Sequence, residues 1–186
     1  MSRQATSMLF AFALALVAST AASAPTSPER YRDLALEIFR ELIEIDTTDS
    51  VGDNGAAARA VARHLLAAGF DEEDVVVLGP IPRKHNLVAR LRGRSTGKRP
   101  LLLLAHLDVV EADPADWSVH PFEFLERDGY YYGRGTTDDK EQAAIWAANL
   151  IRLKHEGTLP DRDIIIALTA DEEGGDHNGI IWLLDN

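Results

Sequence analysis

The sequence predicts an α/β fold with a mostly parallel sheet that is covered by helices on both faces. Two segments, Leu101–Leu104 and Ile164–Leu168, are apolar at every position rather than at every second position. Continuous apolar runs of this length are typical of strands that are buried on both faces of a parallel sheet. A helical pattern, Lys140–Glu156, lies between the two runs. A strand, a crossover helix and a second strand form the unit from which α/β folds are built.

Two helices are predicted to precede these elements. In Tyr31–Ile45 the apolar residues recur with the spacing of one helix face. Ala56–Ala68 repeats that spacing, and Gly69 follows it where a helix commonly ends. Short apolar runs bounded by glycine and proline then predict three strands, namely Val75–Leu78, Asn86–Leu91 and Pro100–Ala105.

Two further elements complete the expected order. Phe122–Tyr132 contains a short hairpin pattern with Asp128-Gly129 at its turn. A last apolar helix begins near Asn178, and the sequence ends within about two helical turns of that point. Because such a short helix is marginal without packing partners, we expect the chain to be the N-terminal part of a longer protein.

The first 24 residues predict a cleaved secretory signal. Arg3 is the only charged residue before Glu29, Met8–Ala18 is an unbroken apolar run, and small residues follow it up to Ala24. This run is too short to cross a bilayer as a helix, so a signal peptide is favoured over a stable membrane anchor. We therefore expect residues 1–24 to be a signal peptide and residues 25–186 to be exported to the periplasm or the extracellular space.

Composition excludes some classes of partner. The formal net charge is −11, which is unfavourable for binding nucleic acid because that function needs clustered Lys and Arg. The one basic stretch, Arg90–Arg99, fits a solvated loop between two strands better than a phosphate-binding surface. The chain has no cysteine, so it cannot form disulfides. Its length suits one domain with one core, to which we assign Trp117 and Trp146.

Acidic and histidine residues occur in three segments next to the predicted elements. The segments read LLLLAHLDVV, YYGRGTTDDK and IIIALTADEEGG. In open α/β sheets, ligand-binding residues lie beyond the carboxyl ends of the strands. The residues that we expect to converge there are His106, Asp108, Asp138, Asp139, Glu172 and Glu173.

This set of side chains predicts a hydrolase site with two zinc ions. Zinc accepts both imidazole nitrogen and carboxylate oxygen, and a pair of ions needs a bridging carboxylate. Glu172 and Glu173 could divide the roles of general base and ligand. Asp108 is two residues from His106, where it could accept the second ring N–H of that ligand. Taken singly, each segment has a commoner explanation, such as a helix cap or a solvated helix start; the prediction rests on all three occurring in this order.

The sequence resembles a family of zinc-dependent exopeptidases and deacylases. The family includes glutamate carboxypeptidase, carnosinase, acetylornithine deacetylase and succinyl-diaminopimelate desuccinylase. The matching motifs are AHLDVV, DWSVHPFEF, YYGRGTTDDK and TADEEGG, and the resemblance extends from about Tyr31 to the last residue. It implies that residues 25–186 are the N-terminal part of a di-zinc catalytic domain. The implied reaction is hydrolysis of an amide bond next to a free carboxylate by metal-activated water.

The resemblance also implies a role for each residue of the site. His106 would bind one zinc ion and Asp108 would orient it. Asp138 would bridge the two ions, Glu172 would be the general base, and Glu173 would bind the second ion. The peptide bond after Asp138 is typically cis in this family. Substrates would be small peptides, for a carboxypeptidase or dipeptidase, or N-acyl amino acids, for a deacylase.

The sequence departs from the family pattern in two ways. Glu141 follows Lys140 where the family usually has glycine, a change that suits the first turn of a helix. The family's remaining aspartate and histidine ligands and its lid domain, through which it forms homodimers, would lie beyond Asn186. We therefore expect low activity from this chain alone and a homodimer only for the full-length protein. His177 fits a loop residue better than a substitute metal ligand. The alternative to an enzyme is an inactive fragment or a non-catalytic module with the same fold.

Overall fold

A computed structural model describes residues 27–95 and 97–186 of the chain. The predicted signal peptide, residues 1–24, lies outside the described residues. Within the described part of the chain, no helix has both the length and the apolar character that crossing a bilayer requires.

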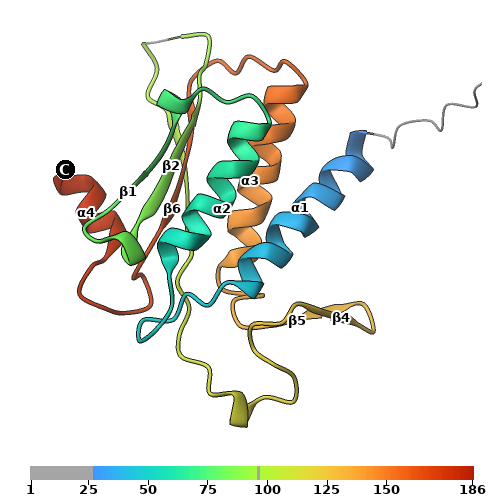
Figure 1. Ribbon diagram of the computed structural model, residues 1–186. Coiled ribbons are helices and arrows are strands. Elements are labelled where there is room, and N and C mark those ends of the chain that lie inside the picture. The colour runs from blue at the N-terminus through green and yellow to red at the C-terminus, as the bar shows by residue number, and fades with distance from the viewer. Residues whose placement is uncertain (1–26, 96) are drawn as a thin grey trace, which may run out of the picture.

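A four-stranded sheet forms the centre of the molecule (Figure 1). Strands β3 and β6 are parallel, with His106 opposite Thr169, whereas β1 and β2, and β2 and β6, are antiparallel. In spatial order the strands are β1 (Val75–Leu78), β2 (Asn86–Leu91), β6 (Ile164–Thr169) and β3 (Leu101–His106).

The predicted α/β class is confirmed, but the sheet is mixed rather than mostly parallel. The reason lies in the connections between the strands. Parallel neighbours need a long crossover, which is usually a helix. Only β3 and β6 are joined in this way, through helix α3 (Lys140–His155). The β1–β2 and β2–β3 connections contain no α-helix among their described residues, and the chain reverses its direction at each of them.

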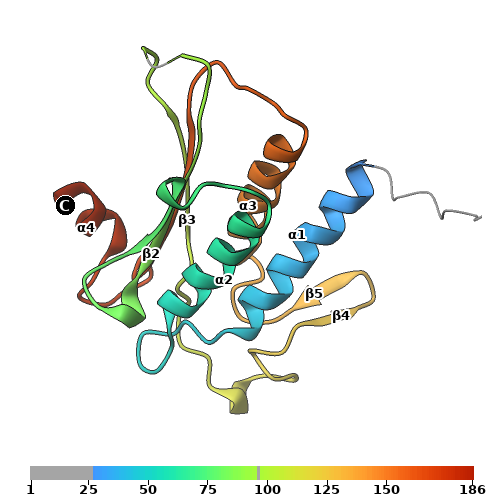
Figure 2. The same ribbon diagram turned by 45° about the horizontal axis from the view of Figure 1, so that its top comes forward.

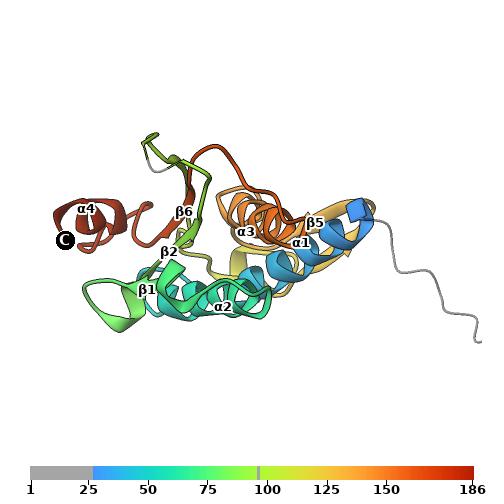
Figure 3. The same cartoon turned by 90° about the horizontal axis from the view of Figure 1, so that it is seen from above.

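Helices lie on both sides of the sheet. Helix α2 (Asn54–Ala67) and α3 pack on one face, and α1 (Ser27–Glu44) packs outside them (Figure 2). Helix α4 (Gly179–Asp185) lies on the opposite side, which is clearest from above (Figure 3). These helices occur where the hydrophobic periodicity predicts them, and their ends differ from the predicted ends by a few residues.

Strand β3 is less buried than its apolar sequence predicts. Leu102 and Leu104 are 53% and 44% exposed, whereas Ile166 and Leu168 of the neighbouring strand β6 are fully buried. The expectation that the Leu101–Leu104 run is covered on both faces is therefore wrong for the described residues. The physical reason is position, because β3 is an edge strand and α4 begins beside Asn86 of β2 rather than over β3.

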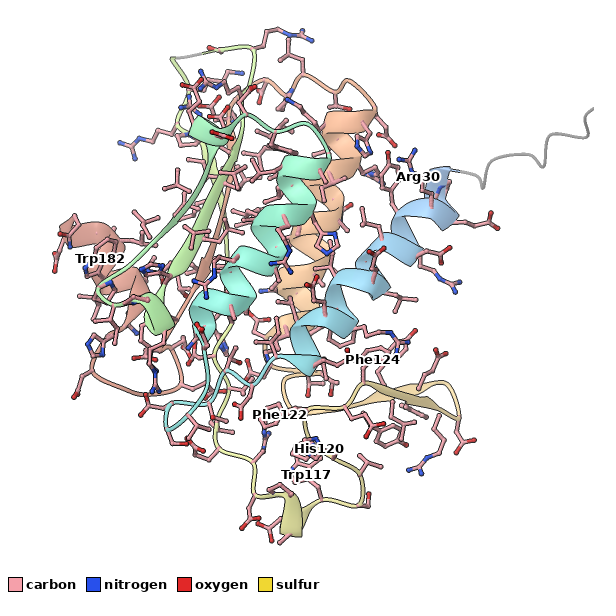
Figure 4. All side chains as sticks on the ribbon, in the orientation of Figure 1. Arg30, Trp117, His120, Phe122, Phe124 and Trp182 are labelled. Carbon is pink, nitrogen blue, oxygen red and sulfur yellow. The ribbon has the colours of Figure 1, made fainter. Side chains whose placement is uncertain are left out.

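A small hairpin follows β3 and leads into the acidic loop before α3. It consists of β4 (Leu125–Arg127) and β5 (Tyr130–Tyr132). The predicted turn at Asp128-Gly129 is confirmed, and both residues have positive φ, as a tight two-residue hairpin turn requires. Phe124, labelled in Figure 4, packs edge-on against Phe39 of α1 with ring centroids 5.4 Å apart. The aromatic contact fixes the hairpin on α1 and so sets the start of the loop that carries Asp138.

Candidate metal centre

The parallel pairing of β3 and β6 brings two of the three acidic segments to one edge of the sheet. Both strands end at the same level, because His106 pairs with Thr169. The Leu107 N–H then donates to the Thr169 carbonyl at 2.7 Å. The loops that follow the two strands therefore start side by side, as the sequence predicts.

Three predicted metal ligands meet at this edge. One potential ligand atom from each of His106, Asp138 and Glu173 lies within 4.8 Å of the other two. His106 Nε2 is 2.9 Å from Asp138 Oδ1 and 3.9 Å from Glu172 Oε2. The His106 side chain is 10% exposed, whereas those of Asp138 and Glu172 are 71% and 59% exposed. The structure therefore forms a possible metal site that has a buried side and an open side.

Asp108 lies behind the cluster and contacts two of its members. His106 Nδ1 is 3.0 Å from the main-chain carbonyl oxygen of Asp108 and 3.6 Å from its carboxylate Oδ1. The other carboxylate oxygen, Oδ2, accepts the Glu173 N–H at 2.9 Å. In this arrangement the carbonyl of Asp108 is the nearer partner of the ring, and the carboxylate holds the main chain of Glu173. A contact of this kind fixes the orientation of a ligating histidine.

The two aspartates before α3 point to different partners. The peptide bond between Asp138 and Asp139 is cis, as the family resemblance implies. Asp138 faces His106 Nε2, whereas the Asp139 carboxylate accepts the main-chain N–H of His106 at 3.4 Å and the Gln142 side-chain amide at 3.3 Å. Asp139 thus connects the end of β3 to the start of α3, and Asp138 is left facing the cluster.

Lys140, next in sequence, has a structural role that no local pattern predicts. Its side chain is fully buried, and Nζ donates to the carbonyls of Leu42 and Ile45 at 2.8 and 2.9 Å. Its stem passes under Gly135, where an added Cβ would lie 2.9 Å from Lys140 Cδ. Burial lowers the pKa of Lys140 to about 7, although Asp46 and Asp108 act in the opposite direction. Lys140 therefore anchors the acidic loop to the end of α1.

The cluster is electrostatically crowded. Burial raises the pKa of Asp108 and of Asp139. Burial, reinforced by repulsion from Asp138, raises the pKa of Glu173. Burial lowers the pKa of His106, but Asp108 and Asp138 more than offset this effect, so that the pKa lies above its usual value.

The two nearby buried lysines direct their hydrogen bonds elsewhere, because Lys140 donates to main-chain carbonyls and Lys84 donates to Asp49 and Asp171. A divalent cation would relieve the repulsion among the carboxylates, and one imidazole with carboxylates is a donor set that suits zinc.

A pocket of about 330 Å³ opens beside the cluster. Asp138 and Glu173 line it together with Trp117, Tyr132 and Arg134. The Arg134 guanidinium lies over the Trp117 ring, 5.1 Å from its centroid. Trp117, in the loop at the bottom of Figure 4, is only half-buried. Its assignment to the core is therefore wrong, whereas Trp146 does pack partly buried against the core.

His177 lies outside the cluster. Its ring is 38% exposed, and its main-chain N–H donates to Asp171 Oδ2 at 3.2 Å. It precedes Asn178, whose side chain accepts the Ile181 N–H and so caps α4. These contacts agree with the interpretation of His177 as a loop residue before a helix.

Two buried residues beside the cluster escaped sequence reasoning. Asp171 directly precedes the glutamate pair, and its carboxylate accepts a hydrogen bond from Lys84. The two residues are 87 positions apart, so no local pattern connects them. The one feature of the sequence that could have indicated Asp171 is that it is a third acid next to Glu172 and Glu173, to which roles were assigned.

Comparison with known proteins gives a consistent result. Residues 102–186 match Peptidase family M20/M25/M40. The chain is 40% identical over 134 residues to a succinyl-diaminopimelate desuccinylase of Paracoccus denitrificans, and 35% identical over 138 residues to the N-fatty-acyl-amino acid synthase/hydrolase PM20D1 of Bos taurus. These alignments cover 72% and 73% of this chain. They cover only 34% and 26% of the two relatives, so the chain spans about a third or less of their length.

Solved structures share the fold. The di-peptidase Dug1p of Saccharomyces cerevisiae superposes with a TM-score of 0.64 at 21% identity, over 80% of this chain and 34% of that one. Human carnosine dipeptidase 1 gives a TM-score of 0.58 at 24% identity, over 80% and 34% of the two chains. The M20 family metallo-carboxypeptidase Sso-CP2 of Sulfolobus solfataricus gives 0.60 at 18% identity, over 75% and 31%.

Proposed function

We propose that the protein is a zinc-dependent hydrolase that cleaves an amide bond next to a free carboxylate, an interpretation supported by the match of residues 102–186 to Peptidase family M20/M25/M40. The substrate is a small peptide, as for a carboxypeptidase or dipeptidase. The observation that supports this most directly is the cluster of His106, Asp138 and Glu173, in which an imidazole and two carboxylates approach within 4.8 Å.

The proposed chemistry divides the work among the residues of the cluster. His106, Asp138 and Glu173 would hold the zinc, with further ligands supplied by the rest of the protein. When bound, zinc would supply polarisation of the scissile carbonyl and would lower the pKa of the attacking water. Glu172 would accept the proton of this water and pass it to the leaving amine. Asp108 keeps His106 and the main chain of Glu173 in place through the contacts described above.

N-acyl amino acid hydrolysis is the second candidate. The two sequence relatives described above are a desuccinylase and an N-fatty-acyl-amino acid synthase/hydrolase by name. A deacylase also cleaves an amide next to a free carboxylate, so the same residues would serve it. The half-buried Trp117 and Arg134 in the adjoining pocket offer an apolar ring and a cation to either kind of substrate.

Location and assembly belong to the same proposal. The apolar N-terminal segment, residues 8–18, supports export to the periplasm or the extracellular space. Family resemblance supports a homodimer for the full-length protein. An exported hydrolase of this kind would act on small peptides or acyl amino acids outside the cytoplasm.

The test is metal-dependent hydrolysis by the full-length protein. The purified protein is freed of metal with a chelator, and zinc is then added back during assays with dipeptides, N-succinyl amino acids and N-fatty-acyl amino acids. We expect activity to disappear on chelation and to return with zinc, on substrates that carry a free carboxylate next to the amide. Activity that persists without metal, or none on any of the three substrate classes, would contradict the proposal.

A further inference from the structure

The segment that carries Glu172 and Glu173 starts in an unusual conformation. Asp171 has φ of 56°, in the left-handed region that few residues other than glycine adopt. Such a conformation persists where the surrounding contacts determine it. The Asp171 side chain is 1% exposed. Its Oδ2 accepts the His177 N–H at 3.2 Å, and its main-chain carbonyl accepts the Asn178 side-chain amide at 3.1 Å. Asp171 thus joins the two ends of the loop 171–178.

Lys84 holds Asp171 from the other side. Its side chain is 3% exposed, and Nζ donates to Asp171 Oδ1 and, at 2.7 Å, to Asp49 Oδ1. Lys84 ends a short turn, Pro82–Lys84, which a single residue separates from β2. Burying an ammonium is costly unless it is paired and hydrogen-bonded, and these two carboxylates pair with Lys84. The carboxylate of Asp171 is therefore fixed to the part of the chain that begins β2.

Neighbouring contacts hold the same segment. Asn86 Oδ1, two residues after Lys84, accepts the Ala170 N–H at 2.9 Å. Asp108 Oδ2 accepts the Glu173 N–H at 2.9 Å on the other side of Glu172. Three successive contacts thus fix Ala170, Asp171 and Glu173, so that Glu172 lies between two anchored residues.

From this arrangement we infer that the buried Lys84–Asp171 ion pair positions Glu172 and Glu173 in the metal centre, so that Lys84 and Asp171 are positioning residues for the hydrolytic site. The inference rests on the proposed function. It assigns Lys84 a role at the centre although Nζ contacts carboxylates other than those of the cluster. Outer residues that orient metal ligands typically change metal affinity or activity by about 10- to 100-fold when they are replaced.

A second lysine–aspartate pair provides a matched control. Lys98 Nζ is 2.6 Å from Asp161 Oδ2, with side chains 49% and 61% exposed. The pair lies beside the opposite, N-terminal end of β6. It has the same chemistry as the Lys84–Asp171 pair, but exposed pairs of this kind contribute little. Lys98→Met therefore removes an equivalent contact and leaves the Lys84–Asp171 pair in place.

The test compares Lys84→Met, Asp171→Asn, their combination and Lys98→Met in the full-length protein. Three quantities are measured: the affinity of the metal-free protein for Co²⁺ by visible absorption, kcat and KM for the zinc-loaded protein, and hydrogen exchange of residues 171–178. We expect Lys84→Met to weaken Co²⁺ binding and to lower kcat by about 10- to 100-fold each, with little change in KM. Exchange should accelerate in 171–178 and not in the strands. Lys98→Met should leave all three quantities unchanged.

The combined variant tests how much of the loss in Lys84→Met comes from leaving the Asp171 carboxylate buried and unpaired. Lys84→Met leaves the Asp171 carboxylate buried without its cation, and a group left in this way is costly. Adding Asp171→Asn removes that charge, so the loss in the combined variant should be smaller than the product of the two single losses. If Lys84→Met fails to fold, Asp171→Asn alone carries the test, because asparagine preserves the shape of the side chain.

The outcomes are distinguishable. A Lys84→Met protein with a lower melting temperature, but with unchanged Co²⁺ affinity and kcat, would show a purely structural pair and overturn the inference. If the unmodified protein bound no Co²⁺ and hydrolysed nothing, the proposed function would fail instead. Hydrogen exchange of residues 171–178 would then decide the positioning claim alone: faster exchange in Lys84→Met would support it, and unchanged exchange would overturn it.

Discussion

The two ends of strand β6 both lie beside acidic residues, but the surroundings of those acids are opposite. At the N-terminal end, Asp163 accepts the Gly93 N–H at 2.7 Å and pairs with Arg90, and Asp161 pairs with Lys98. The Gly93 hydrogen bond and Arg90 hold the pKa of Asp163 below its usual value. Each of these acids has a donor or a cation beside it.

At the C-terminal end the acids crowd one another. Burial raises the pKa of Asp108 and Glu173, and repulsion from Asp138 adds to the effect at Glu173. The number of acidic residues therefore does not identify a metal site. What distinguishes the C-terminal end is that several buried or crowded carboxylates share an imidazole, while the lysines beside them have other partners.

The substitution with the strongest consequence removes the proposed general base, Glu172, at the C-terminal end. In the full-length protein, Glu172→Ala should lower kcat by about 10²- to 10⁴-fold, the range that a positioned general base contributes. Zinc content, measured by atomic absorption, should not change, because Glu172 is not among the proposed ligands. Asp161→Asn at the other end is the matched control and should retain full activity. Undiminished turnover by Glu172→Ala would remove Glu172 from the proposed chemistry.

A second prediction concerns Lys140, whose buried Nζ at the C-terminal end donates to main-chain carbonyls. Burial lowers its pKa to about 7 in the folded state, against 10.5 ordinarily. Between these values the unfolded chain binds more protons than the folded chain. The free energy of unfolding should therefore rise with pH over this interval, by at most about 1.4 kcal/mol per pH unit. Below pH 7 the contribution should be constant.

Lys140→Met should remove this part of the pH dependence. The measurement is urea unfolding of the metal-free protein at several values between pH 7 and 10, with Lys98→Met as control because that lysine is exposed. The Lys98→Met slope should equal the wild-type slope, and the Lys140→Met slope should be smaller. Equal slopes for all three proteins would mean that Lys140 is charged in the folded state throughout this range.

Much of the fold and of the candidate site follows from local sequence. The apolar runs fix β3 and β6, and because these strands are parallel, their ends bring His106 and Glu173 to one edge. The exposed face of β3 could not be predicted, since an apolar run gives no information about which neighbours cover it. The Lys84–Asp171 pair and the burial of Lys140 were equally inaccessible, because they depend on contacts between residues 87 to 98 positions apart. Local patterns specify which groups reach the site, and distant contacts decide how those groups are held.

The smallest expected effect lies at the N-terminal end, where Asp163→Asn tests the other half of the comparison. The folded-state pKa of Asp163 is lowered, so its stabilising contribution should be present above the unfolded value near 3.8 and should disappear as pH falls through the folded value. Thermal unfolding should therefore show a slightly lower melting temperature for Asp163→Asn at pH 7, and the difference from wild type should vanish in acid. Zinc affinity and kcat should not change. A loss of zinc affinity in Asp163→Asn would mean that the two ends of β6 are coupled, and that acids at either end serve the metal centre.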